Sequence, residues 1–129
     1  MGEAVKRMIA YGMIIAIVVL LIFSCQSRAD ESEPILIPVK ITGYCLHGTM
    51  ANGEQTHSGV CAYRKQDIGK YAILYDSDMN YIGQYEIADT GKKGGAIRKG
   101  LAVDVWFDTK EECYAFTNTG YIQVIDAEG

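Results

Sequence analysis

Leu101-Ala102-Val103-Asp104-Val105-Trp106-Phe107 is the stretch of sequence that decides the fold. Its β-branched and aromatic residues favour a strand, and successive side chains of a strand point to opposite faces. One face is wholly apolar and is expected to face a core: Leu101, Val103, Val105 and Phe107. The other face is expected on the outer wall of the domain: Ala102, Asp104, Trp106 and the following Asp108.

Other strands are expected on both sides of this stretch. Four segments share a strand-like composition: residues 39–46, 71–75, 81–87 and 121–125. Residues 76–80 are turn formers, so the segments that flank them predict a hairpin. The one helix is expected over residues 108–116, where Thr109 and Glu112 fit a capping box. Many short strands with one small helix indicate a mainly β fold that closes into a barrel, because closure removes exposed strand edges.

Residues 1–24 predict a signal peptide or membrane anchor. Lys6 and Arg7 precede an uncharged run from Met8 to Phe23, which is marginal for crossing a membrane because a span usually needs about 20 apolar residues. Residues 22–25, Ile-Phe-Ser-Cys, resemble the lipobox of bacterial lipoproteins, although phenylalanine is unusual there. Lipidation at Cys25 and an uncleaved anchor are equal alternatives, and both place the domain outside the cytoplasmic membrane.

The remaining chain divides into a tether and one domain. Residues 25–36 predict a flexible tether, because the stretch from Gln26 to Pro34 within them is polar and charged and lacks apolar side chains to bury. Residues 37–127 form the expected folded domain. The chain has 12 Lys and Arg against 16 Asp and Glu, a net charge of −4, and beyond the N-terminus it has no basic cluster larger than a pair such as Lys92-Lys93. This composition argues against nucleic-acid binding.

Cys45 and Cys61 flank one loop, and oxidising conditions outside the cell would permit a disulfide between them. A bridge over a loop of that size would stabilise the fold by about 3 kcal/mol in the chain-entropy model. The alternative is that both are small buried apolar residues. His47 and His57 lie in the same loop, and their spacing matches no standard zinc pattern with either cysteine.

Two parts of the sequence suggest a ligand site. Carboxylates beside an indole, as at Asp104, Trp106 and Asp108, suit a sugar, which offers hydroxyls and an apolar ring face; a solvated strand face is the alternative. Asp89-Thr90-Gly91 enters a glycine-rich loop, residues 91–100, that would let backbone approach a ligand closely. An ordinary Asx turn is the alternative there.

In this order the motifs resemble the 3D (three-aspartate) domain of Gram-positive stationary-phase survival proteins and of the membrane-bound lytic murein transglycosylase A family. The similar residues of the first block are Tyr44, Gly48, Ala51-Asn52-Gly53, Thr56 and Gly59. Those of the second are Asp89-Thr90-Gly91, Gly94-Gly95-Ala96-Ile97, Gly100 and Val103-Asp104-Val105-Trp106-Phe107. The resemblance extends from Ile41 to Ile125.

The resemblance implies a small six-stranded double-psi β-barrel with an acidic groove that cleaves peptidoglycan between N-acetylmuramic acid and N-acetylglucosamine. Asp104 would be the catalytic acid and base, and Asp89 would support it or orient the sugar. Burial and a neighbouring carboxylate would raise the pKa of the acid. The remaining expected substrate-binding residues are Trp106, Asp108, Thr90, Gly91, Gly95, Tyr44 and Thr56. No cofactor or metal is expected, and the partners would be glycan strands and, through the N-terminus, the membrane.

The sequence departs from the family pattern at the third aspartate. Arg64 occupies its position in the matching stretch, and Asp67 is close enough along the chain to replace it in space. The loop between Asp89 and Asp104 is also longer than usual and contains Lys92 and Lys93. A peptidoglycan-binding module or surface lipoprotein with a degenerate active site is therefore the alternative to an enzyme.

Overall fold

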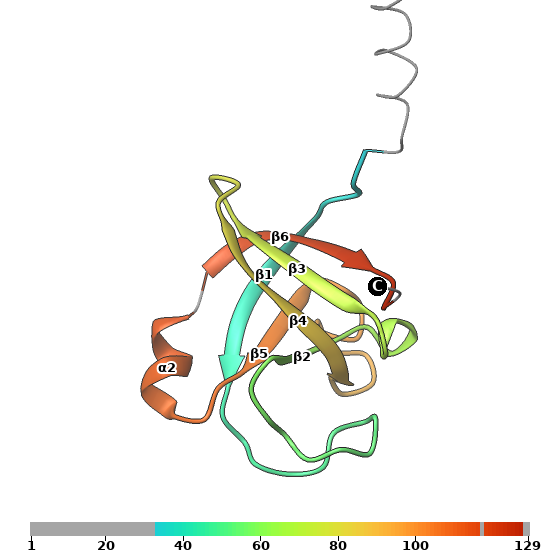
Figure 1. Ribbon diagram of the computed structural model, residues 1–129, viewed down its shortest axis with the longest axis vertical. Coiled ribbons are helices and arrows are strands. Elements are labelled where there is room, and N and C mark those ends of the chain that lie inside the picture. Colours follow the sequence, from blue (N-terminus) through green and yellow to red (C-terminus); the bar gives the residue numbers. More distant parts are fainter. Residues whose placement is uncertain (1–32, 117, 128–129) are drawn as a thin grey trace, which may run out of the picture. The chain divides into compact units, whose positions relative to one another are not determined.

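The computed structural model describes residues 33–116 and 118–127 (Figure 1). The elements in chain order are β1 (Ile37–Tyr44), β2 (Val60–Tyr63), the 3₁₀-helix η1 (Lys65–Asp67), β3 (Tyr71–Asp76), β4 (Tyr81–Thr90), β5 (Ala102–Trp106), the helix α2 (Lys110–Ala115) and β6 (Asn118–Ile125). The expected signal or anchor, Cys25 and most of the tether lie outside the described residues. Within residues 33–116 and 118–127, no helix is long and apolar enough to cross a membrane.

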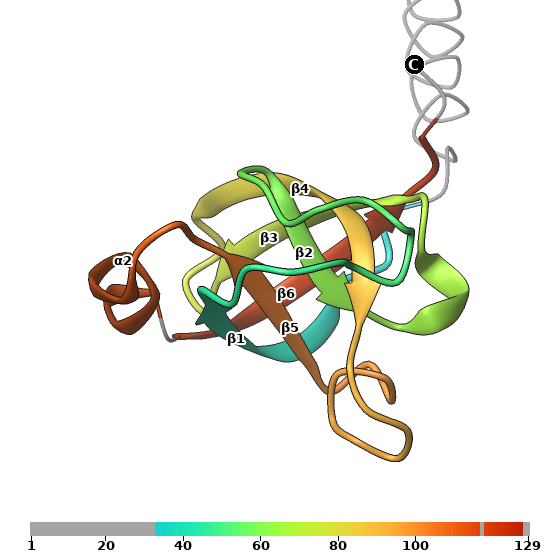
Figure 2. The same cartoon turned by 90° about the horizontal axis from the view of Figure 1, so that it is seen from below.

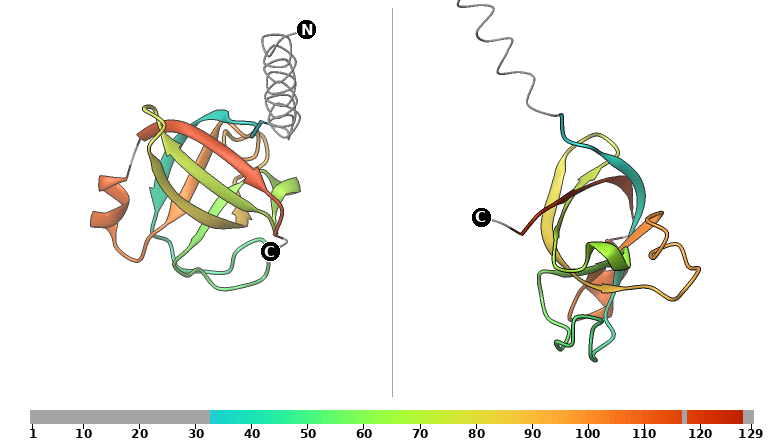
Figure 3. Two further views of the ribbon diagram at one scale, coloured as in Figure 1. Left: turned by 45° about the horizontal axis from the view of Figure 1, so that its top comes forward. Right: turned by 90° about the vertical axis from the view of Figure 1, so that its right-hand side faces the viewer.

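The six strands form one sheet, in the order β1-β5-β2-β4-β3-β6. Because β6 also pairs with β1, the sheet closes into a barrel, visible in the right-hand view of Figure 3. The pairs β1–β5 and β2–β4 are parallel, and the other four pairs are antiparallel. The expectation of a mainly β fold with one short helix is confirmed.

The strand order has an internal symmetry. Exchanging β1 with β4, β2 with β5 and β3 with β6 leaves the order unchanged, and it also exchanges the two parallel pairs with each other. The segments β1–β2 and β4–β5 are therefore equivalent in the sheet. No repeat in the sequence indicates this equivalence.

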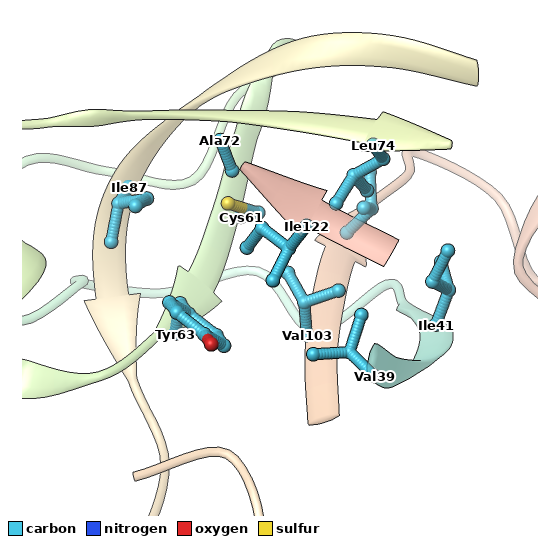
Figure 4. Packing of buried hydrophobic residues seen from close by; sticks show 10 residues of the cluster. Val39, Ile41, Cys61, Tyr63, Ala72, Leu74, Ile87, Val103 and Ile122 are labelled. Carbon is cyan, nitrogen blue, oxygen red and sulfur yellow. The ribbon is translucent and has the colours of Figure 1, made fainter. Parts of the chain in front are cut away.

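Alternating side chains of the strands fill the barrel. The buried cluster inside it contains Val39, Ile41, Cys61, Tyr63, Ala72, Leu74, Ile87, Val103, Val105 and Ile122 (Figure 4). The inward direction expected for Val103 and Val105 is confirmed, and Phe107 packs against the same cluster. The prediction that Leu101 faces the core is wrong, because Leu101 precedes β5 and its side chain is 61% exposed.

A second apolar cluster lies outside the barrel. It consists of Met50, Val60, Ala88 and Trp106, with Tyr44 packed against them, and we call it the outer cluster. Residues 45–59, here named the covering segment, run from β1 to β2 across this face (Figure 2). Hydrogen bonds from its backbone reach the end of β4, where Ala88 accepts from Asn52 at 3.1 Å. The covering segment therefore gives the outer side of β5, β2 and β4 its own packed layer.

The expected hairpin and helix are both present. β3 and β4 form the hairpin, and Asp76 Oδ1 accepts hydrogen bonds from the backbone of Asp78 and Asn80 in the turn, each at 2.9 Å. Thr109 caps α2 by accepting from Glu112 N at 3.4 Å, as the sequence predicts. β2 was not expected, since its four residues are buried on both faces and show no alternation of apolar and polar side chains.

Of the two alternatives for Cys45 and Cys61, the structure has the free thiols, and no disulfide joins them. Cys61 lies on β2 within the buried cluster, with its side chain inside the barrel. Cys45 follows the end of β1 and lies near α2, where it contributes to raising the pKa of the Cys113 thiol. Cys45, at the start of the covering segment, and Cys61, on the strand that follows it, therefore lie in different environments.

Candidate functional site

Four residues on neighbouring strands form a row across the outer face of the sheet. Asp104 on β5 pairs with Thr42 on β1 and with Ala62 on β2, and Ala62 in turn pairs with Asp89 on β4. Paired residues of a sheet share a face. We call this set the cross-strand row. It places the two expected catalytic aspartates on one face, with only the methyl side chain of Ala62 between them.

A β-bulge sets the position of Asp89 in this row. The pairing of β2 with β4 shifts between Cys61 and Ala62, so that Cys61 pairs with Ile87 and Ala62 with Asp89, leaving Ala88 without a partner. Such bulges re-aim side chains and often lie beside functional sites. Without this bulge, Ala88 would pair with Ala62 and would take the place of Asp89 in the cross-strand row.

Asp104 is a half-buried carboxyl with one side-chain partner. Thr42 Oγ1 donates to Asp104 Oδ1 at 2.8 Å. Burial raises the pKa of Asp104 above its ordinary value, and the hydrogen bond from Thr42 lowers it in part. Because desolvation disfavours the charged form, this environment favours a carboxylic acid that can donate a proton.

Asp89 connects the covering segment to β4. Its Oδ1 accepts from the backbone N–H of Ala51 at 3.0 Å and from that of Thr90 at 2.9 Å. Ala51 belongs to the Ala-Asn-Gly motif, so the two motif blocks meet at this carboxylate. Asp89 therefore holds the covering segment over the cross-strand row.

The hydroxyl of Tyr44 lies within electrostatic range of both aspartates. Burial, and after it the charges of Asp89 and Asp104, raise the pKa of the Tyr44 phenol well above its usual range. The hydroxyl is buried, and within the described part of the chain it has no hydrogen-bond partner. Leaving a buried hydroxyl unsatisfied costs about 1–3 kcal/mol, and in native proteins such groups commonly meet water or a ligand. Tyr44 thus presents an unused donor beside the two carboxyls.

Trp106 is placed differently from its sequence expectation. It pairs with Tyr44 on the outer face, but the outer cluster leaves it only 6% exposed. Its Nε1 donates to the carbonyl of Leu46 at 2.9 Å, and the ring of His47 contacts its edge. The indole therefore supports the covering segment and offers no open flat surface for a sugar.

The other expected binding residues lie around the row without joining it. Asp108 is exposed, and its carboxylate lies 3.6 Å from His47 Nε2. Thr90 pairs with Tyr63, a residue of the barrel interior, so its side chain points away from Asp89; its buried hydroxyl has no partner within the described residues. Thr56 Oγ1 accepts from Gly48 N at 3.3 Å inside the covering segment.

The glycines of the expected binding loop have packing roles. A β carbon at Gly91 would lie 2.8 Å from Cβ of Ile97, and one at Gly95 would lie 3.0 Å from the side chain of Lys92. The loop between β4 and β5 is therefore tightly turned on itself, with Gly95 N donating to Lys92 O at 2.9 Å. These contacts explain the glycines without a ligand.

Arg64 and Asp67 form an ion pair. Arg64 Nε lies 2.6 Å from Asp67 Oδ2, and Lys70 Nζ lies 3.6 Å from the other carboxylate oxygen. The Asp67 side chain is only 3% exposed. With two cations as its partners, Asp67 is committed to a structural pair on η1, and it does not replace the missing family aspartate beside Asp104 and Asp89.

Within residues 33–116 and 118–127, one group of side chains could hold a metal ion: Glu54, His57 and Glu86. Their ligand atoms lie within 4.8 Å of one another, and His57 Nδ1 contacts the carbonyl of Ser58 at 2.8 Å. The set contains neither cysteine considered from the sequence. Two surface hollows, of about 350 Å³ and 230 Å³, are lined by other residues and include neither Asp89 nor Asp104.

Thr42 and Ala62 are members of the row that sequence reasoning missed. Thr42 lies two residues before Tyr44 on one strand, so alternation alone could have placed it on the face of Tyr44. The sequence does not mark Ala62 as a site residue, because its methyl side chain has no functional group and matters only through its small size. Its position follows only from the pairing of β2 with both β4 and β5.

No protein-family profile, curated protein or solved structure matches this chain.

Changing Asp104 to asparagine is expected to make stability less dependent on pH. The pKa of Asp104 in the folded protein lies above that of the unfolded chain, about 3.9. The folded state therefore loses stability as the pH rises from the unfolded pKa through the folded one. An amide does not titrate, so the variant gains stability over the parent across that window and keeps the gain at pH 7.

Urea denaturation of both proteins at about pH 3, 5 and 7 measures this difference. Asp78→Asn, at an exposed position of the β3–β4 turn, is the matched control and should show no such gain. A gain for Asp104→Asn that is already complete at the lowest pH would contradict a raised pKa.

Proposed function

We propose that this chain is a peptidoglycan lytic transglycosylase built on a double-psi β-barrel. It would cleave the bond between N-acetylmuramic acid and N-acetylglucosamine during cell-wall turnover. It would act outside the cytoplasmic membrane, anchored by residues 1–24 or by lipid on Cys25, or secreted to the wall. No cofactor is required.

The fold proposal is supported by the symmetric strand order. A double-psi barrel contains two equivalent strand–loop–strand units that interlock through parallel pairs. The segments β1–β2 and β4–β5 have this relationship, since β1 lies beside β5 and β4 beside β2, with β2 and β5 adjacent between them. Each of these units carries one block of the motifs that resemble the 3D domain.

The chemical proposal depends on the cross-strand row above all. Asp104 is a half-buried acid of raised pKa that shares a face with Asp89, and the free hydroxyl of Tyr44 is near both. In the proposed reaction Asp104 donates its proton to the glycosidic oxygen as the bond to the anomeric carbon breaks. Its carboxylate then takes the proton of the muramyl 6-hydroxyl as that oxygen bonds to the anomeric carbon, giving a 1,6-anhydro product.

The remaining groups of the site would position the sugar. Asp89 is bound to the covering segment by two backbone amides, so it would set how that segment meets the glycan strand. Tyr44 would donate its unused hydrogen bond to a sugar oxygen. Ala62 leaves room between the two carboxyls, because a larger side chain there would fill the row.

Mass spectrometry of muropeptides released from purified peptidoglycan tests this function. Residues 26–129, which include the compact unit from Ile35 onward, would be used as the soluble protein. Anhydro-muropeptides are the expected products. Reducing-end products would replace transglycosylation with hydrolysis, and absence of any product from folded protein would contradict enzymatic cleavage.

A peptidoglycan-binding module is the second candidate, and the pair of Arg64 with Asp67 favours it. This pair occupies the place where the 3D pattern has its remaining aspartate. A module predicts that the protein pellets with peptidoglycan and releases nothing. Tyr44→Phe keeps the ring in the outer cluster and removes the unpaired hydroxyl, so it should weaken pelleting if the row binds glycan.

A further inference from the structure

α2 is attached to the barrel mainly through one buried side chain. Within Lys110–Ala115 the buried residue is Cys113, and most of the helix surface is exposed. The backbone of α2 touches β1 at Gly43, where a β carbon would lie 3.0 Å from Cα of Cys113. Only a glycine at position 43 allows this close approach.

Cys45 lies two residues after Gly43, on the side of the chain that faces α2. Its side chain is half-buried, and after burial it is the main influence that raises the pKa of the Cys113 thiol. Two cysteines can be bridged when their α carbons are about 4.4–6.8 Å apart and their side chains converge. Gly43 brings β1 against the backbone of Cys113, and Cys45 acts on the pKa of the Cys113 thiol, so both cysteines lie where β1 meets α2.

We propose that Cys45 and Cys113 form a disulfide under oxidising conditions, which locks α2 onto the end of β1. The bond would connect the residue next to Tyr44 with the one buried side chain of α2. This inference does not depend on the proposed glycan cleavage, and it replaces the pairing of Cys45 with Cys61 that the sequence suggested.

The oxidant would be a disulfide donor, such as a thiol–disulfide oxidoreductase or oxidised glutathione. The thiolate of Cys45, the more exposed of the two, attacks the donor and forms a mixed disulfide with release of one donor thiol. The thiolate of Cys113 then attacks the Cys45 sulfur and releases the second thiol. Two protein thiols are oxidised, one donor disulfide is reduced, and the protons of both cysteines pass to the released thiols.

The environment of Cys113 sets the pH dependence of this reaction. Burial, and next the neighbouring Cys45, raise the pKa of the Cys113 thiol. Since the thiolate is the reactive form, bridge formation is expected to accelerate as the pH rises above neutrality. Asp104 and Glu112 are the charged groups that act on Cys113, and both disfavour its thiolate.

The test uses the full-length protein in detergent, oxidised with glutathione disulfide, alkylated and digested without reduction. Trypsin alone leaves Cys45 and Cys61 on one peptide, residues 41–64, so a glutamyl endopeptidase is added to cut after Glu54. The expected product links the fragment containing Cys45 to the fragment containing Cys113. A link to Cys61, or recovery of Cys45 and Cys113 as alkylated thiols, would overturn the proposal.

Thermal unfolding gives an independent readout. Oxidation is expected to raise the Tm by about 10 °C, and a reductant should reverse it. Cys45→Ala removes a half-buried thiol, so it should fold and lose the response, whereas Cys61→Ala should retain it. A response that survives in Cys45→Ala would contradict the assignment, and so would its loss in Cys61→Ala if that variant folds.

Discussion

Asp104→Asn is expected to lower the rate of muropeptide release by about 1,000-fold, within the range that general acid–base catalysis contributes. The amide keeps the shape of the side chain and can still accept from Thr42 Oγ1, whose bond to Asp104 is 2.8 Å long. It has no proton of suitable acidity to give to the glycosidic oxygen, and it cannot take one from the muramyl hydroxyl. Liquid chromatography with mass spectrometry of the released products measures the rate.

The same variant distinguishes a chemical effect from a structural one. Because burial raises the pKa of Asp104, asparagine should stabilise the fold at pH 7 while it removes activity. Asp78→Asn, the matched control on the β3–β4 turn, should release muropeptides at the parent rate. If Asp104→Asn retains that rate, Asp104 is not the acid of the reaction.

Asp67→Asn is expected to reduce the free energy of unfolding by about 3 kcal/mol, because breaking a buried ion pair leaves an uncompensated charge. Asp67 is 3% exposed and is bound by Arg64 and Lys70, whereas Arg64 retains some access to water. The cost should therefore fall at the lower end of the range for such pairs. Urea denaturation monitored by tryptophan fluorescence measures it.

Asp126→Asn is the matched control for this prediction. Asp126 also lies near Lys70, at 4.0 Å, but its side chain is 82% exposed. Pairs of that kind contribute about 0–1 kcal/mol. An equal loss of stability in Asp67→Asn and Asp126→Asn would contradict the special position of Asp67.

The ion pair also limits how the missing family aspartate can be restored. Arg64→Asp alone would set a second carboxylate beside the buried Asp67 and remove the closer of its two cations. We expect this single change to destabilise the protein through like-charge repulsion. Arg64→Asp with Asp67→Asn avoids the repulsion, so the double variant is the proper test of whether a third aspartate improves the site.

The parts of the fold that sequence predicts best have local signals. The β3–β4 hairpin is set by the turn around Asp76, and α2 begins at a threonine cap. The alternation along β5 correctly separates Val103 and Val105 from Asp104. By contrast, β2 has four buried residues without a period, so pattern alone could not find the strand at the centre of the site.

In the candidate site, too, some features have a local signal in the sequence and others do not. The motifs and the alternation along β5 identify Asp104 and Asp89 from the sequence. That they lie on one face depends on the pairing of Ala62 with both and on the bulge at Ala88, which the sequence does not reveal. Trp106 was expected in the open because Asp104 and Asp108 share its face of the strand. It is buried because the covering segment folds back over it, and such a contact between distant segments leaves no trace in the local pattern.

The closure of the sheet has a consequence for how the chain folds. β1 finds its partners only near the other end of the domain, since Lys40 pairs with Ala102 and Thr119. Contacts between residues so far apart in sequence require large loops to close first, which makes folding slow. A chain still missing β6 would leave both β1 and β3 with an unpaired edge. The domain therefore reaches its folded state only after its last strand has been synthesised.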